Sequence, residues 1–270
     1  MAGFFVKRDR TVKPPLGTPL RTDGHWSVWG LVGCWLFNEG AGNHSTNLVL
    51  NGNFAWSNNR VLFDGATGYG KLAKNILPNY YGISAVVFLK CNGLALDARI
   101  LSFRNSISGT PFLTFGVGDS SNTSLRLISR NINTTFTYNY SAPASLSVGV
   151  NFSCGFVADM TSGGLAKLYK AGKQIGSTQT ATATMSDILD VVGVGAFVAN
   201  SSASNFLSSD MTCVLIYNRA LSPAEIASLS ANPWQVAQPE VVYFGSAAAG
   251  NMFQSAWARQ SNQILGAGYV

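Results

Sequence analysis

The sequence predicts an all-β domain: a two-sheet antiparallel sandwich with one short C-terminal helix and an extended arm at each end. Charged residues make up 11% of the 270 residues. Ordinary soluble domains carry about 25%, so Ser, Thr, Asn and Gly must supply the surface polarity here. About a dozen short apolar runs recur, with Gly, Asn and Asp turn signals between them. Short strands separated by turns at this spacing are typical of sandwiches and barrels.

Residues 1–29 are expected to form an extended, basic and proline-rich arm, because Pro14-Pro15 and Gly17-Thr18-Pro19 leave no helical period. A basic arm can bind nucleic acid or an acidic partner. The clustered lysines and base-stacking aromatics of nucleic-acid binders are missing from it, however. We therefore expect this arm, together with a docking tail at residues 237–270, to contact other protein chains. The expected assembly contacts are Lys7, Arg8, Arg10, Lys13, Phe253 and Trp257.

The strands of the sandwich are expected within residues 30–236. Their runs are 31–37, 60–63, 83–90, 100–103, 111–117, 125–128, 136–140, 148–157, 165–169, 174–176, 189–198 and 214–217. Lys170 to Lys173 is expected to form a hairpin turn in which Gly172 supplies a positive φ.

The stretch that closes the domain carries the clearest local signals. Residues 214–217 are branched and aromatic, which favours a strand buried on both faces. Ser222 can cap a helix, and Glu225 follows it at the spacing of a capping box. Ile226 and Leu229 give this helix an apolar face, and an Asn-Pro pair ends it.

No apolar run approaches the roughly 18 residues that a membrane span needs. Residues 1–10 place their charges after a short apolar patch, the wrong order for a signal peptide. The chain is therefore expected to be made in a cytoplasm. Its four cysteines are far apart in sequence and lie in apolar runs, so buried free thiols are expected; they are Cys34, Cys91, Cys154 and Cys213.

Five stretches carry a family resemblance: GLVGCWLFNEGAGN at 30–43, RVLFDGATGYG at 60–70, ISAVVFLK at 83–90, AKLYKAGKQIGS at 166–177 and VLIYNRALSPAEIASL at 214–229. In this order they resemble the concanavalin A-like, laminin-G-type jelly-roll domain. The ending at 231–234 is similar to the variant found in structural proteins of tailed bacteriophages. The resemblance implies two curved sheets whose loops often bind sugars, sometimes with calcium.

The chain departs from the family where acidic residues are usual. Thr212-Cys213 precedes the last strand, and Ala66-Thr67-Gly68 follows Asp64. Neither a metal nor another cofactor is therefore expected, and Asp64 is expected to cap a turn.

Three functions remain to be weighed. The first, which is the function expected from the sequence with the second as its alternative, is a non-enzymatic structural protein of a phage virion, in the capsid surface, a fibre or the tail. It would be anchored through its arms, oligomeric, and in contact with other virion proteins. The second is a lectin-like module for glycans on a host or other surface. Its site would combine aromatic rings with polar side chains, and the expected residues are Asn79, Tyr80, Tyr81, Tyr138, Asn139 and Tyr140.

The third function is a glycosidase, which normally needs two carboxylates about 5–10 Å apart. The chain has three glutamates. Glu39 is expected in a glycine-rich turn, Glu225 in a helix cap and Glu240 in the C-terminal tail, so each has a structural explanation. Neither histidine lies in a recognisable triad. No catalytic residue, and no enzymatic activity, is therefore expected.

Overall fold

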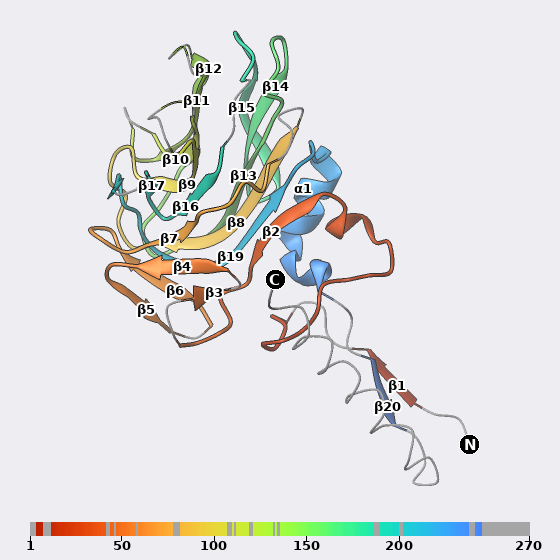
Figure 1. Cartoon of the computed structure of the whole chain (residues 1–270). Helices are drawn as coiled ribbons and strands as arrows, with labels where there is room; N and C mark the ends of the chain where they lie inside the picture. The colour runs from red at the N-terminus through yellow and green to blue at the C-terminus, as the bar shows by residue number, and fades with distance from the viewer. Residues whose placement is uncertain are drawn as a thin grey trace.

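The computed structural model describes residues 4–7, 12–41, 44–45, 47–57, 59–77, 82–106, 110, 112–118, 121–131, 133, 136–185, 189–199, 202–237 and 241–244. These residues form the predicted sandwich of two antiparallel sheets with one short helix (Figure 1).

One sheet, which we call the front sheet, has eight strands. In spatial order they are β12 (Phe136–Pro143), β11 (Ser124–Arg130), β10 (Phe112–Val117), β9 (Arg99–Arg104), β16 (Val191–Val194), β7 (Tyr69–Leu72), β4 (Leu48–Asn51) and β3 (His44–Ser45).

The other sheet, the back sheet, also has eight strands. Seven follow one another in a continuous hydrogen-bonded order, and the eighth pairs with one of these seven. In spatial order they are β15 (Lys173–Thr180), β14 (Leu165–Lys170), β13 (Asn151–Ala158), β8 (Ile83–Cys91), β19 (Ser208–Tyr217), β6 (Val61–Asp64) and β5 (Phe54–Trp56), with β2 (Leu31–Trp35) paired to β19. Two small ladders join β17 (Phe197–Val198) to β18 (Ala203–Ser204) and β1 (Phe4–Lys7) to β20 (Val241–Phe244).

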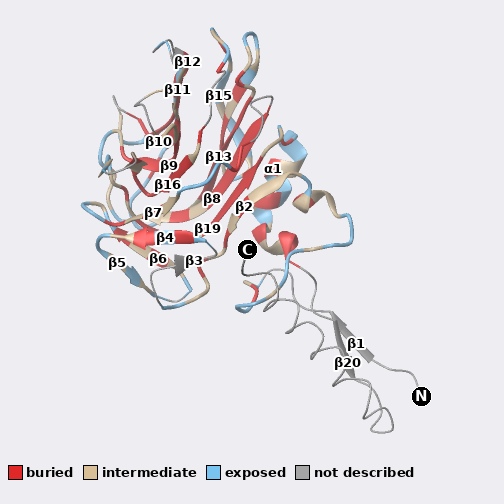
Figure 2. Ribbon diagram, in the orientation of Figure 1, coloured by how far each residue is buried: buried red, intermediate tan, exposed pale blue. Residues whose placement is uncertain are grey.

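The main core lies between the sheets, where the buried residues gather (Figure 2). Phe115 of β10 and Phe156 of β13 meet across it with ring centroids 5.4 Å apart. Strands at the centre of a sandwich supply every second residue to this layer. Burial of these alternating apolar sets is what holds the two sheets together.

A second apolar cluster covers the outer face of the back sheet. Helix α1 (Pro223–Ala231) and the short 3₁₀ helices η1 (Trp26–Val28) and η2 (Pro233–Val236) supply its outer side. The buried hydroxyl of Tyr217 donates to the Ser27 carbonyl at 2.8 Å. Because β19 is covered on both faces, the prediction of a doubly buried closing strand is confirmed.

The predicted capping box is present at the start of α1. The Ser222 hydroxyl accepts the Glu225 N–H, and the Glu225 carboxylate accepts the Ser222 N–H. Arg219 binds both carboxylate oxygens of Glu225 and also the carbonyls of Trp26 and Trp29. One side chain therefore ties the helix to the N-terminal segment.

Several strand boundaries differ from those predicted. β19 begins at Ser208, six residues before the expected start, because Asp210 is accommodated in the sheet by Lys90 at 2.6 Å. The expected run 189–198 is interrupted at Gly195, which has φ of +79°. The predicted hairpin turn has positive φ at both Ala171 and Gly172, as a two-residue turn of this kind requires.

The described helices are short. Helix α1 has nine residues, and a membrane span needs about 20. No helix in the described part of the chain could therefore cross a membrane. All four cysteines are free, as predicted, and Cys34 alone among them is partly exposed.

Candidate functional site

A basic pocket lies on the outer face of the front sheet, where β9, β10 and β11 meet the β17–β18 hairpin. Its volume is about 290 Å³. We call it the arginine pocket, and it is lined by Asp97, Arg99, Phe112, Arg126, Ile128, Arg130, Phe197 and Asn205. Three guanidinium groups and one carboxylate are the charged groups of this lining.

Alternation along β11 puts two of the arginines on this face. Leu125 and Leu127 belong to the core between the sheets. Successive side chains of a strand point to opposite faces, so Arg126, Ile128 and Arg130 point away from that core. The outward set of this strand is thus basic at both ends and apolar in the middle.

The pairing register extends the basic set across three strands. Arg130 lies opposite Phe112, and Phe112 lies opposite Arg104 on its other side. The rings of Phe112 and Phe197 meet edge to face with centroids 5.6 Å apart. The guanidinium carbon of Arg104 lies 4.2 Å from the ring centroid of Phe197. The guanidinium carbon of Arg130 lies 5.9 Å from the ring centroid of Phe112. Such cation–π contacts restrict where the guanidinium groups can lie.

Asp97 holds the other two arginines in place. It has a φ of +61°, and its carboxylate lies 2.7 Å from the Arg99 guanidinium and 3.2 Å from that of Arg126. Arg126 also donates to the amide oxygen of Asn139 at 2.8 Å, and Asn205 donates to Asp97 at 3.1 Å. Arg99 and Arg126 are only 7% and 9% exposed. Their charges are therefore fixed in a largely dehydrated environment.

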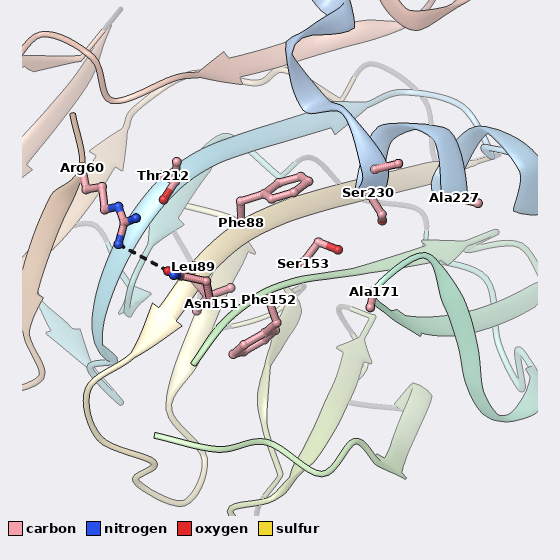
Figure 3. A pocket seen from close by; sticks show the side chains of 11 residues that line it. Arg60, Phe88, Leu89, Asn151, Phe152, Ser153, Ala171, Thr212, Ala227 and Ser230 are labelled. Atoms are coloured by element: carbon pink, nitrogen blue, oxygen red, sulfur yellow. Dashed lines mark hydrogen bonds between the residues drawn. The ribbon is translucent and has the colours of Figure 1, made fainter. Parts of the chain in front are cut away.

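A second hollow lies on the opposite sheet, between the outer face of β8 and β13 and helix α1 (Figure 3). Its volume is about 540 Å³. We call it the helix-side groove, and it is lined by Arg60, Phe88, Leu89, Asn151, Phe152, Ser153, Ala171, Thr212, Ala227, Ser230 and Ala231. Arg60 donates to the side-chain oxygen of Asn151 at 3.3 Å and lies 3.9 Å from Asp210. Arg60 shares this carboxylate with Lys90, whose ammonium lies 2.6 Å from it.

Asp64, which lines a third hollow, caps a turn as predicted. One carboxylate oxygen accepts the N–H groups of Ala66, Thr67 and Gly68 at 2.7–2.9 Å, and the other accepts the Thr67 hydroxyl. Burial acts to raise the pKa of Asp64, but these hydrogen bonds outweigh it and hold the pKa well below its usual range. Within the described ranges, no three His, Cys, Asp or Glu side chains come together as a metal site would require.

The predicted sugar-binding residues divide into three groups. Tyr138 and Tyr140 are 2% and 8% exposed and belong to the core. Their hydroxyls donate to the carbonyls of Asp159 and Ile175, and burial raises the pKa of both. Neither ring offers a face on which a sugar could stack. The prediction that Tyr138 and Tyr140 contact a sugar therefore needs correction. Both side chains of β12 point into the core between the sheets.

Asn139, between these tyrosines, points outward and reaches the arginine pocket through Arg126. Asn79, Tyr80 and Tyr81 lie outside the described residues. Of the six predicted residues, Asn139 is thus the one that the structure brings to a candidate site.

Of the predicted assembly residues, Lys13 binds the chain's own domain. Its ammonium donates to the carbonyls of Phe37, Asn59 and Thr212, and it lies 5.6 Å from a ring centroid of Trp234. Lys7 lies on β1, opposite Val241 of β20. Arg8, Arg10, Phe253 and Trp257 lie outside the described residues.

The residues of the arginine pocket were not predicted from the sequence. A signal does exist in the run SLRLISR, where the two arginines lie four residues apart and so share one face of a strand, opposite the two leucines. Arg99, Phe112 and Phe197 carry no such signal, because strand pairing and a distant hairpin bring them together.

A family model described as the concanavalin A-like lectin/glucanases superfamily matches residues 64–227. No curated protein matches the chain in sequence.

Solved structures share the fold. The CBM40 of a Ruminococcus gnavus IT-sialidase, bound to α2,3-sialyllactose, is 18% identical with a TM-score of 0.53, over 63% of this chain and 96% of that one. Domain 4 of the arabinanase AbnA from Geobacillus stearothermophilus, in complex with arabinotriose, is 14% identical with a TM-score of 0.54, over 74% and 98%. The receptor-binding domain of botulinum neurotoxin C/D mosaic serotype is 14% identical with a TM-score of 0.56, over 74% and 51%. At these identities the likeness establishes the fold.

Proposed function

The chain belongs to the concanavalin A-like lectin/glucanases superfamily, and on this premise we propose that it is a non-enzymatic glycan-binding module whose ligand enters the arginine pocket. The observation that carries the proposal is the composition of this pocket. Two aromatic rings adjoin guanidinium, amide and carboxylate groups in one hollow. Sugars need both kinds of partner, since they present apolar faces and a dense set of hydroxyl groups.

The similar structures support this choice of ligand class. The R. gnavus module is described as bound to a sialylated lactose, and the G. stearothermophilus domain as bound to arabinotriose. Both share the two-sheet fold with this chain at TM-scores above 0.5. A module that binds without cutting fits the residues of the pocket, because Asp97 is the one carboxylate of its described lining and glycoside hydrolysis normally needs two.

A glycan array tests the proposal with a matched pair of ring deletions. Phe112→Ala removes a ring from the arginine pocket, and Phe88→Ala removes one from the helix-side groove. We expect the intact chain to bind glycans. Phe112→Ala should weaken binding about three- to tenfold, because an aromatic contact contributes about 0.5–1.5 kcal/mol and Phe112 also supports Arg130.

Phe88→Ala should bind as the intact chain does, and thermal melts of both variants serve as the folding control. No binding to any glycan at high protein concentration would contradict the proposed function. A loss confined to Phe88→Ala would move the site to the helix-side groove.

A second candidate is a structural component of a phage virion, held in place through its terminal segments and in contact with other virion proteins or with copies of itself. The pairing of β1 with β20 supports it, since it brings the two terminal segments together as one possible attachment point. The two functions are compatible in one chain. Mass spectrometry of purified particles tests this candidate, and absence of the chain at stoichiometric levels would reject it.

A further inference from the structure

We propose that the helix-side groove is a second binding site, and that its ligand is an acylamino carboxylate: a carboxylate group next to an amide group, joined to an apolar body. Free N-acyl amino acids and the C-terminal ends of peptides share this chemistry. The groove lies on the opposite sheet from the arginine pocket, so this inference does not depend on the glycan-binding function proposed above.

The charges at one end of the groove favour an anionic ligand. Asp210 lies 2.6 Å from Lys90 and 3.9 Å from Arg60. Within the described ranges, no other carboxylate is in ion-pair contact with either cation. Two positive charges therefore share one negative charge, and the closer contact belongs to Lys90. Arg60 lines the groove with 32% of its side chain exposed, so a ligand can reach its charge.

The contacts of Arg60 leave one edge of its guanidinium group available. Its Nη1 atom donates to the side-chain oxygen of Asn151 at 3.3 Å and is also the atom nearest Asp210. The edge formed by Nε and Nη2 has no hydrogen-bond partner in the part of the chain that the structure describes. Two parallel N–H groups on such an edge match the two oxygens of a carboxylate. The bond to Asn151 (Figure 3) limits the conformations of Arg60 before a ligand arrives, which lowers the cost of binding.

A buried hydroxyl group in the groove favours an amide next to the carboxylate. Cys154 and Phe156 of β13 belong to the core between the sheets, so Ser153 points to the opposite, outer face. It lies opposite Phe88 in the pairing of β13 with β8 and is 6% exposed. No described residue forms a hydrogen bond with its hydroxyl group. A buried hydroxyl without a partner costs free energy, and an amide would supply a partner where a hydrocarbon chain would not.

The remaining walls and the volume suit an aromatic ring. Phe88 lies in the middle of the groove, and Ala171 and Ala227, at the end away from Arg60, carry only methyl groups (Figure 3). The volume of about 540 Å³ is within the range of about 300–1,000 Å³ that is usual for ligand pockets. A ring beside Phe88 would gain an aromatic contact, and the methyl-lined end leaves room for it.

Calorimetry with the full chain and matched small probes tests the inference. The main probe is hippurate, which joins a benzoyl ring, an amide and a carboxylate. Its methyl ester lacks the negative charge, and 4-phenylbutyrate has the ring and the carboxylate at the same spacing but no amide. We expect the ester to bind at least about tenfold more weakly, because a charge-assisted pair of hydrogen bonds is lost. 4-Phenylbutyrate should bind about three- to tenfold more weakly, because the Ser153 hydroxyl stays unpaired.

Variants locate the site. Arg60→Gln should lower the affinity for hippurate at least about tenfold, while Arg60→Lys, which keeps the charge without the planar edge, should retain part of it. Ser153→Ala should bind hippurate and 4-phenylbutyrate equally, because the hydroxyl that distinguishes them is gone. Phe112→Ala, in the arginine pocket, is the matched control and should bind hippurate as the intact chain does. Thermal melts check that each variant is folded.

A pentapeptide that ends in Phe-Gly distinguishes the two sources of ligand. With a free carboxylate it contains the proposed chemistry, and with a C-terminal amide it should bind as weakly as the methyl ester does. Tighter binding of the free-carboxylate peptide than of hippurate would assign the groove to peptide ends. Weaker binding of this peptide would assign it to free N-acyl amino acids, and either order supports the inference.

No binding of hippurate at millimolar concentration would overturn the inference, as would equal binding of hippurate and its methyl ester or unchanged binding in Arg60→Gln. Equal binding of hippurate and 4-phenylbutyrate to the intact chain would contradict the proposed class of ligand, because the amide would contribute nothing. These probes contain no sugar, so their failure would leave glycan binding standing, and a glycan array without binding would leave this inference standing.

Discussion

Single carboxylates organise several local regions of this molecule. Asp97 forms ion pairs with two buried arginines. Asp210, on the back sheet, forms ion pairs with Lys90 and Arg60. Asp64 accepts hydrogen bonds from three backbone N–H groups in a turn. In a chain where charged residues are scarce, each of these side chains has several partners. Replacing one of them therefore disturbs more than one contact.

Asp64→Ala should destabilise the domain by about 1 kcal/mol, the usual cost of losing a side chain that caps backbone N–H groups. Asp64→Asn keeps an oxygen acceptor at the same place and should recover much of the loss. Chemical denaturation of the three proteins measures the difference. Equal stability of Asp64→Ala and the intact chain would show that water replaces the carboxylate without cost.

At the scale of elements, α1 is positioned by contacts at its first turn and by its buried face. The capping box satisfies two backbone N–H groups, and Arg219 links Glu225 to the segment at Trp26–Val28. Burial acts to raise the pKa of Glu225, but its bonds to Arg219 and Ser222 lower it overall. Ile226 and Leu229 then fill the cluster over the back sheet. The helix thus covers the sheet that faces away from the arginine pocket.

Ser222→Ala should lower stability by about 1 kcal/mol, which corresponds to a fall in Tm of about 2–4 °C for a domain of this size. Ser222→Asp, which keeps a capping oxygen, is the matched control and should melt close to the intact chain. A Tm for Ser222→Ala within half a degree of the intact chain would mean that the packing of Ile226 and Leu229 alone determines the helix.

At the scale of the whole molecule, the sandwich separates two surfaces of different chemistry. The front sheet exposes a basic hollow, and the back sheet is covered by α1 and the N-terminal segment. Residues 12–29 lie along this second surface, with Leu20 bridged to Ala237 and the Arg21 N–H bonded to the Val236 carbonyl at 2.9 Å. The buried thiols and tyrosines lie in these apolar layers, so the stability of the whole domain depends on pH in the alkaline range.

Stability should fall as the pH rises above about 9. Burial raises the pKa of Cys34 to about 12 and that of Cys91 to about 11, and it raises the pKa values of Cys154 and Cys213 well above their usual value. The native state keeps these protons while the unfolded chain releases them, so each thiol costs up to about 1.4 kcal/mol per pH unit. Lys13 acts in the opposite direction, because burial lowers its pKa to about 8, but it is one group against four.

Denaturant unfolding at pH 8, 9, 10 and 11 measures this slope. Cys91→Ala should lessen the slope between pH 9 and 11, after allowance for a lower stability at pH 8. Lys13→Met should make it steeper between pH 8 and 10. A stability that stayed level up to pH 11 would show that the thiols can ionise in the folded protein.

Much of the fold follows from short-range patterns in the sequence. The capping box, the hairpin turn at Lys170–Lys173 and the alternating strands depend on residues within a few positions of one another, whose preferences are local. The closing strand was missed over Ser208–Cys213, because a distant lysine makes a buried Asp210 tolerable there.

The candidate site depends on distant pairings. Because successive side chains of a strand point to opposite faces, the sequence already places Tyr138 and Tyr140 on one face of their strand, and Arg126 and Arg130 on one face of theirs. It does not determine which of the two faces of each strand points to the core. The second sheet resolves this choice by packing against the tyrosines. Strand register and the β17–β18 hairpin then bring Asp97, Phe112 and Phe197 to the arginines. Local chemistry in the sequence thus establishes the strands, turns and cap, whereas the basic pocket arises from long-range packing, because its members are neighbours in space and not along the chain.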